Sequence, residues 1–230
     1  FEFETEIQPI YDSRKSRNKT ASVLALIMLA SATFSCSGND GHKGRSAVIT
    51  LADTTDIQPQ YPDTSVILQY LGLNEGIWGG CYLEASTICE ATYSPSYIHE
   101  LPHKECIMEN LQEREAEVFN FKKDIQASFD KVRPRGGGAT GHSVIFSRIW
   151  VSAVKLHGMD YEHKWVICFS DLLENSTVNF YDKRHLALLK SNPDSVEHML
   201  MSSVQKDDIS GVSILMVYKP KDYADRKSVV

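Results

Sequence analysis

The sequence lacks both an apolar run long enough to cross a bilayer and a surplus of basic residues. Its longest apolar stretch, Ala21 to Phe34, is shorter than the roughly 20 residues of a membrane-spanning helix, which excludes a polytopic membrane protein. Lys and Arg number 24 against 30 Asp and Glu, so the formal net charge is -6. Because the basic residues are also scattered along the chain, we expect no nucleic-acid partner.

Cysteine is scarce and follows no recognisable spacing. Five cysteines occur in 230 residues, and no two of them form a CxxC pair. Without such pairs the sequence predicts neither a zinc site nor a redox motif, and buried free thiols are the expected state. Cys81 and Cys89, predicted on adjacent strands, are the one pair for which a disulfide is worth testing.

The chain does have the composition of a folded protein with one sizeable core. Hydrophobic residues make up 42% and charged residues 23% of it. Short apolar runs predict buried strands, an alternating run predicts an exposed edge strand, and amphipathic runs predict helices. The expected strands are 47–52, 78–86, 88–98 (the edge), 164–169 and 211–218, and the expected helices are 64–71 (with Asp63 as N-cap), 105–132, 143–157 and one or two short ones broken at Pro193.

This alternation of strands and helices predicts an α/β fold. We expect a three-layer, Rossmann-like sheet that is mostly parallel, with one antiparallel edge strand and helices on both faces. Residues 1–36 are interpreted as an N-terminal extension and signal, and the polar stretch 37–45 as a flexible tether. Residues 46–230 then form the single folded domain.

The N-terminal segment is built like a secretory signal. A cluster of Arg and Lys precedes the apolar run, and the small residue Ser35 stands directly before Cys36. This resembles a bacterial lipoprotein signal, in which Cys36 becomes the lipidated first residue. Thr33 and Phe34 depart from the Leu-like and small residues of such signals. The resemblance implies a lipid anchor in the bacterial cell envelope, periplasmic or surface-exposed; an ordinary signal or anchor and a core helix are the alternatives.

Polar side chains follow the predicted strands at the points where they end. Asp53 and Thr55 come after the strand at 47–52, Asp171 comes after the strand at 164–169, and Ser143 ends a Gly-rich stretch. Ligands of α/β sheets bind beyond the carboxyl ends of strands, and carboxylates and hydroxyls are the ligands of Mg²⁺. A single Asp after a strand can instead cap the next helix, but two of them beside a hydroxyl-bearing loop favour a metal site.

At these residues the chain resembles the von Willebrand factor A-like domain family. The metal-ion-dependent adhesion site of that family has a first loop Asp-x-Ser-x-Ser, a Thr in a second loop and an Asp after a later strand. Asp53 matches the first Asp, Thr55 stands for the first Ser, and Asp171 matches the later Asp. Ile57 occupies the place of the second Ser, so the resemblance implies that one ligand is lost.

Two other loops of the chain fit the family with differences. The hydroxyl of the second loop has two registers, because Thr140 follows the glycines more closely whereas Ser143 better preserves the spacing to the helix. Leu172 stands where the family usually has Gly after the later Asp. The family also has a further strand and helix after the segment ending at Tyr218, and the residues that follow are too few to supply both.

The resemblance implies a binding protein rather than an enzyme. In the family a divalent cation leaves one coordination position open for a carboxylate of a protein partner; here Mg²⁺ would be weakly held or absent. The expected molecule is therefore a monomeric, lipid-anchored protein with such a partner. The alternative is a Mg²⁺-dependent phosphohydrolase with Asp53 as nucleophile, similar to the haloacid-dehalogenase-like family, although Thr55 stands where that family has a second Asp. Nucleotide binding is disfavoured because His142 replaces the Lys of a phosphate loop.

Overall fold

The structure, a computed structural model, describes residues 44–54, 61–74, 76–88, 94–104, 110–133 and 143–217. The chain divides into two units, Phe1–Ser35 and Cys36–Val230, and all described residues belong to the second. The predicted lipidation residue Cys36 and the predicted site residues Thr55, Ile57 and Thr140 lie outside the described residues, as do Cys89 and His142.

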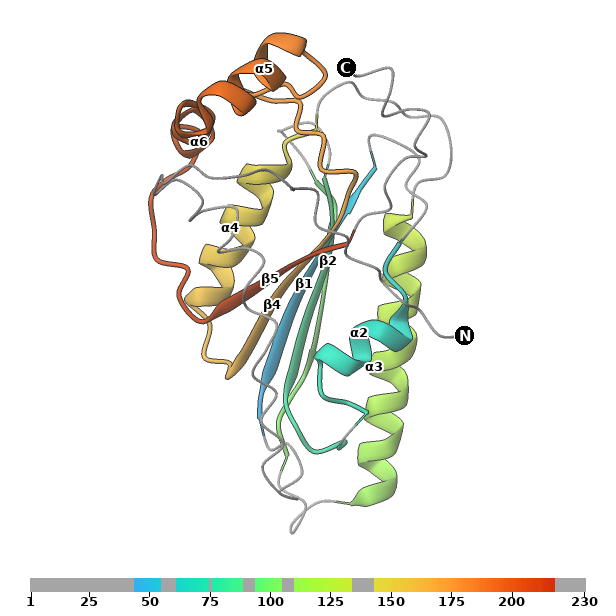
Figure 1. The fold of residues 1–230 in the computed structure, drawn as a ribbon. Helices are drawn as coiled ribbons and strands as arrows, with labels where there is room; N and C mark the ends of the chain where they lie inside the picture. The colour runs from blue at the N-terminus through green and yellow to red at the C-terminus, as the bar shows by residue number, and fades with distance from the viewer. Residues whose placement is uncertain are drawn as a thin grey trace, which may run out of the picture. The chain divides into compact units, whose positions relative to one another are not determined.

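A five-stranded sheet forms the centre of the domain (Figure 1), in the order β3-β2-β1-β4-β5. All neighbouring strands are parallel except β3, which pairs antiparallel with β2 at one edge. This confirms the predicted mostly parallel sheet with one antiparallel edge strand. The strands are β1 (Ser46–Asp53), β2 (Cys81–Ile88), β3 (Ser96–Leu101), β4 (His163–Phe169) and β5 (Val212–Val217).

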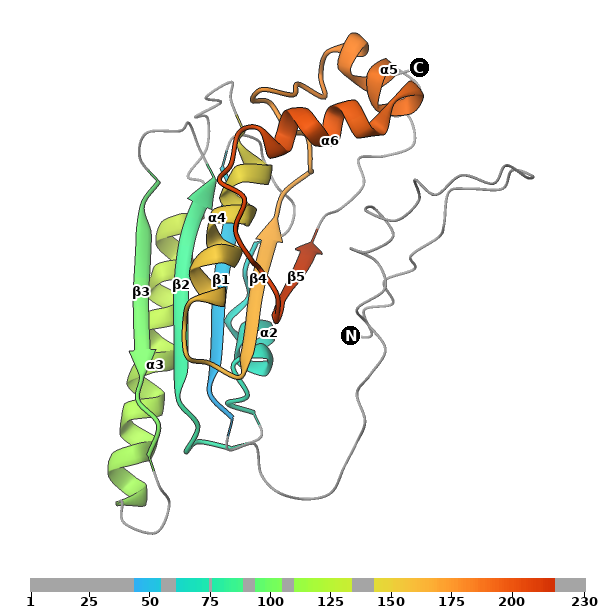
Figure 2. The same cartoon turned by 90° about the vertical axis from the view of Figure 1, so that its left-hand side faces the viewer.

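Helices cover both faces of the sheet and form the outer two layers (Figure 2). On one face lie α2 (Thr64–Tyr70) and α3 (Leu111–Val132), and on the other lies α4 (Ile145–His157). Two short helices, α5 (Lys183–Ser191) and α6 (Pro193–Met201), follow β4 and lie beyond the carboxyl end of the sheet. Pro193 is the first residue of α6, so the predicted break at this proline is confirmed.

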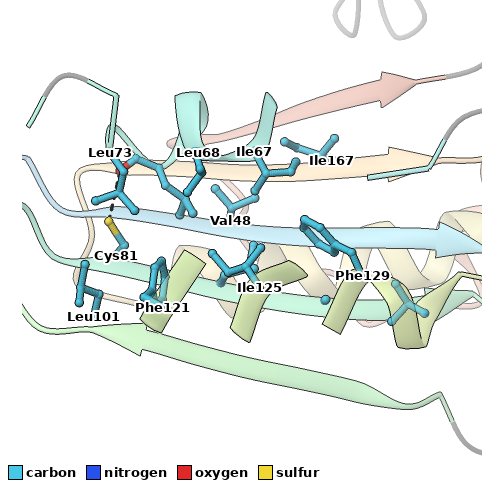
Figure 3. Close-up of a cluster of buried hydrophobic side chains, with 14 of the residues drawn as sticks. Val48, Ile67, Leu68, Leu73, Cys81, Leu101, Phe121, Ile125, Phe129 and Ile167 are labelled. Carbon is cyan, nitrogen blue, oxygen red and sulfur yellow. Dashed lines mark hydrogen bonds between the residues drawn. The ribbon is translucent and has the colours of Figure 1, made fainter. Parts of the chain in front are cut away.

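Strand β1 is buried along its whole length because both of its faces are covered. Val48 and Ala52 belong to the core cluster beneath α2 and α3, whereas Ile49 and Leu51 belong to the cluster beneath α4. On the first face, α3 presents Phe121, Ile125 and Phe129 toward the sheet, four residues apart as on one side of a helix (Figure 3).

Three predicted boundaries are wrong. The edge strand, predicted at 88–98, is β3 at Ser96–Leu101, and Ile88 instead ends β2. Strand β2 begins at Cys81 rather than at 78, because the Arg114 side chain of α3 binds the carbonyl oxygens of Ile77 and Gly79. Helix α3 begins at Leu111 rather than at 105, after an extended Asn110 whose side chain accepts a hydrogen bond from Gln112.

The cysteine predictions have different outcomes. Cys81 and Cys168 are free and buried, as expected of thiols in a core. The disulfide considered between Cys81 and Cys89 is not formed, since Cys81 is a free thiol; Cys89 itself lies outside the described residues.

Candidate functional site

The carboxylate of Asp53 lies where three segments of the chain meet. Asp53 is the last residue of β1, and its side chain is only 1% exposed. Ser143, just before α4, donates a hydrogen bond from Oγ to Asp53 Oδ2 at 3.0 Å. Ser170, just after β4, donates from its Oγ to the same oxygen at 2.8 Å. Of the residues predicted for the site, the structure thus brings Asp53 and Ser143 together and adds Ser170 to them.

The register of the sheet explains this convergence. Strands β1 and β4 are parallel neighbours, with Ala52 opposite Phe169, so Asp53 and Ser170 follow at the same carboxyl edge. Side chains alternate between the two faces of a strand. Leu51 and Cys168 belong to the cluster beneath α4. Asp53 and Ser170 lie two positions further along their strands, so they face the start of that helix.

Asp171 plays a different local part from the one that its position in the sequence suggests. Its Oδ1 accepts a hydrogen bond from the backbone N–H of Leu173 at 2.9 Å, which closes a turn within its own loop. Asp171 and Asp53 do lie at the same carboxyl edge of the sheet, because they end neighbouring parallel strands. Ser170, the residue before Asp171, donates its hydroxyl hydrogen to Asp53. The next helix along the chain, α5, begins only at Lys183, so Asp171 does not cap a helix that directly follows its strand.

The backbone of this loop has the conformation that glycine adopts most easily. Leu172 has a φ of 63°, in the left-handed region that a bulky L-residue disfavours by about 1 kcal/mol. The loop is held in place because Ser170 Oγ accepts a hydrogen bond from the N–H of Leu172 at 3.0 Å. Further along, the N–H of Asn175 donates to the carbonyl oxygen of Ser143 at 2.9 Å. The loop after β4 and the start of α4 are therefore tied together.

Glu174 is a buried carboxylate that the sequence analysis missed. It is 3% exposed, and its Oε2 accepts a hydrogen bond from the backbone N–H of Phe146 at 2.8 Å. It thereby caps α4, whose own preceding residue Val144 supplies no side-chain cap. Burial raises the pKa of Glu174, and the negative charge of Asp53 raises it further, against the opposing effect of the nearby Ser176 hydroxyl and of the helix N–H groups.

These groups form an oxygen-rich site without soft ligands. Two carboxylates, Asp53 and Glu174, and two serine hydroxyls are the kind of donors that Mg²⁺ or Mn²⁺ accepts. The thiol of Cys168 belongs to the hydrophobic cluster beneath α4, where burial and the charges of Asp53 and Glu174 raise its pKa, so it stays neutral. Among the described residues no group of three or more His, Cys, Asp or Glu side chains is placed to hold a metal.

A second polar hollow, of about 330 Å³, lies between β3 and α3 and includes His99 and Asp124 in its lining. His99 Nε2 lies 2.6 Å from the buried hydroxyl of Ser128. Burial lowers the pKa of His99, which favours the neutral ring. His99 belongs to β3 and is half-buried, whereas His103 lies after the strand and is exposed.

Comparisons with known proteins find no family model that matches the chain, no matching curated protein and no matching solved structure. Of the helices that the structure describes, none combines the length and the apolar character of a membrane span.

Proposed function

We propose that this chain is an envelope-anchored binding protein with a von Willebrand factor A-like domain that contacts a protein partner through a weakly held divalent cation. The observation that carries the proposal is the meeting of the Ser143 and Ser170 hydroxyls on the buried carboxylate of Asp53. A cation at this point would find two hydroxyl oxygens and one carboxylate already gathered from three separate segments.

Three further features support this proposal. The sheet has one antiparallel strand at its edge, as the alternating pattern of the sequence predicts. Leu172 has the left-handed backbone expected where the family has Gly, so the loop keeps this conformation although its residue differs. Ser170 also supplies a hydroxyl at the site, which offsets the ligand that Ile57 cannot provide.

The environment of Asp53 favours binding over phosphoryl transfer. A nucleophilic carboxylate needs one oxygen open to the phosphorus atom of its substrate. The side chain of Asp53 is 1% exposed, and its Oδ2 already accepts two hydrogen bonds. These contacts suit a carboxylate that holds its neighbours and a cation in place.

The proposal is tested by metal-dependent unfolding of the full chain. With a dissociation constant of order 1 mM, a tenfold excess of Mg²⁺ should raise the free energy of unfolding by roughly 1.4 kcal/mol. We expect Asp53→Asn to abolish this increase. Asp160→Asn is the matched control, because Asp160 is exposed and precedes β4, at the opposite end of that strand. An unchanged melting curve of the wild-type chain in Mg²⁺ and in Mn²⁺ would refute the metal-dependent part of the proposal.

The lipid anchor at Cys36 rests on the sequence alone. In a bacterial host we expect the protein to partition with membranes, since two or more acyl chains give stable attachment. Cys36→Ala should move it to the soluble fraction, and mass spectrometry should find acyl groups on the N-terminal Cys36 of the wild type. Membrane association that survives Cys36→Ala, with an unmodified wild-type N-terminus, would rule the anchor out.

A further inference from the structure

Among the described residues, three carboxylate side chains are buried, and they differ in whether a positively charged side chain pairs with them. They are Asp53, Glu84 and Glu174. Glu84 accepts a hydrogen bond from Lys155 Nζ at 2.6 Å and another from the Tyr82 hydroxyl at 3.0 Å. Within the described parts of the chain, Glu174 forms no ion pair. A buried carboxylate without a partner of opposite charge is unfavourable, and a bound cation would compensate its charge.

One of the two carboxylate oxygens of Glu174 has no hydrogen-bond partner in the described structure. Oε2 accepts from the N–H of Phe146, whereas Oε1 is buried and, in the described structure, has no hydrogen-bond partner. Such an unpaired buried oxygen in a folded protein indicates a bound water or ion. The N–H of Phe180 donates to the backbone carbonyl of Glu174 at 2.9 Å, and the next residue, Asn175, is bonded to Ser143. The carboxylate is therefore held in a fixed place at the start of α4.

That place belongs to the same site as Asp53. Both carboxylates are bonded to the start of α4, Asp53 through the Ser143 hydroxyl and Glu174 through the N–H of Phe146. Ser143 links the two acidic groups, because its hydroxyl binds Asp53 while its carbonyl oxygen binds the residue after Glu174. Two like charges buried near each other repel, and a divalent cation removes that repulsion.

We propose that Glu174 is a further ligand of the cation bound at Asp53, through its Oε1. This inference rests on the proposed function, because it assumes that the site binds a divalent cation. A divalent Mg²⁺ or Mn²⁺ ion would neutralise two carboxylate ligands, here Asp53 and Glu174. The two serine hydroxyls complete a set of hard oxygen donors.

The test is a calorimetric titration of the full chain with Mn²⁺. Glu174→Gln is the informative variant, because its amide oxygen can still accept the hydrogen bond from Phe146 while the charge is lost. We expect the dissociation constant to rise about tenfold or more. Glu115→Gln is the matched control, since Glu115 is exposed on α3, and it should bind Mn²⁺ like the wild type. Melting curves without metal establish that each variant is folded.

The outcomes separate this inference from the proposed function. In one outcome the wild type binds Mn²⁺, the Asp53→Asn variant does not, and the Glu174→Gln variant binds with a dissociation constant within twofold of the wild-type value. The assignment of Glu174 is then overturned, and the cation site at Asp53 stands. If the wild type binds no Mn²⁺, both the Glu174 inference and the proposed cation site are refuted. Should Glu174→Gln fail to fold, Glu174→Asp, which keeps the charge on a shorter side chain, should weaken binding at least about threefold. Wild-type affinity in that variant would contradict the inference.

Discussion

Replacing Ser170 by Ala should destabilise the domain more than replacing Ser143, although each serine donates one hydrogen bond to Asp53. The hydroxyl of Ser170 has two partners: it donates to Asp53 Oδ2 at 2.8 Å and accepts from the N–H of Leu172 at 3.0 Å. The hydroxyl of Ser143 contributes through its bond to Asp53.

The magnitudes follow from these partners. A hydrogen bond to a charged group contributes about 1.5–3 kcal/mol, and a neutral one about 1 kcal/mol. We therefore expect Ser143→Ala to lower the free energy of unfolding by about 2 kcal/mol and Ser170→Ala by about 3 kcal/mol. The loss at Ser170 includes the bond that holds Leu172 in its left-handed conformation.

A double-mutant cycle with Asp53→Ala assigns these energies to their contacts. In that background Ser143→Ala should have almost no effect, because its acceptor is gone. Ser170→Ala should still lower the free energy of unfolding by about 1 kcal/mol, because its hydrogen bond with Leu172 is lost in either background. The measurement is urea unfolding in the presence of EDTA, so that no cation contributes. If both serine effects are the same with and without Asp53, neither serine is stabilised by its hydrogen bond to this carboxylate and the reasoning fails.

Two other predictions concern parts of the fold away from this site. Arg114→Met should lower the free energy of unfolding by about 3–5 kcal/mol in urea titrations, because the fully buried guanidinium is the hydrogen-bond donor to the carbonyls of Ile77 and Gly79; a loss under about 1 kcal/mol would contradict this. Burial lowers the pKa of His99, so the unfolded chain binds more protons and stability should fall as the pH drops below about 6.5. His99→Gln should flatten this dependence between pH 7 and pH 5, whereas the exposed control His103→Gln should keep the wild-type slope.

The sequence alone was sufficient where a local pattern carries the information. The run at 47–52 contains apolar residues at nearly every position, which only a strand covered on both faces requires, and β1 is such a strand. The position of Asp63 predicts a cap for the helix at 64, and its Oδ1 accepts the N–H of Ser65 at 2.8 Å. The same holds for α4, whose apolar spacing predicts a helix ending at His157.

Contacts between distant segments determine features that these local patterns do not predict, such as where β2 begins. The start of β2 depends on Arg114, which lies more than thirty positions later in the chain and removes residues 77–79 from the strand. A charged residue on an amphipathic helix predicts a solvent-exposed side chain, and nothing nearby in the sequence indicates that this one is buried.

For the candidate site, the sequence by itself determined that Asp53 ends a buried strand and that a hydroxyl, Ser143, precedes the helix that packs on it. It did not distinguish Ser170 from Asp171, because that choice depends on which face of β4 each side chain occupies, and the register with β1 sets the face. Glu174 became part of the site only through tertiary structure: a Glu in a polar loop is ordinarily solvated, and this one is buried because its loop folds over the first turn of α4.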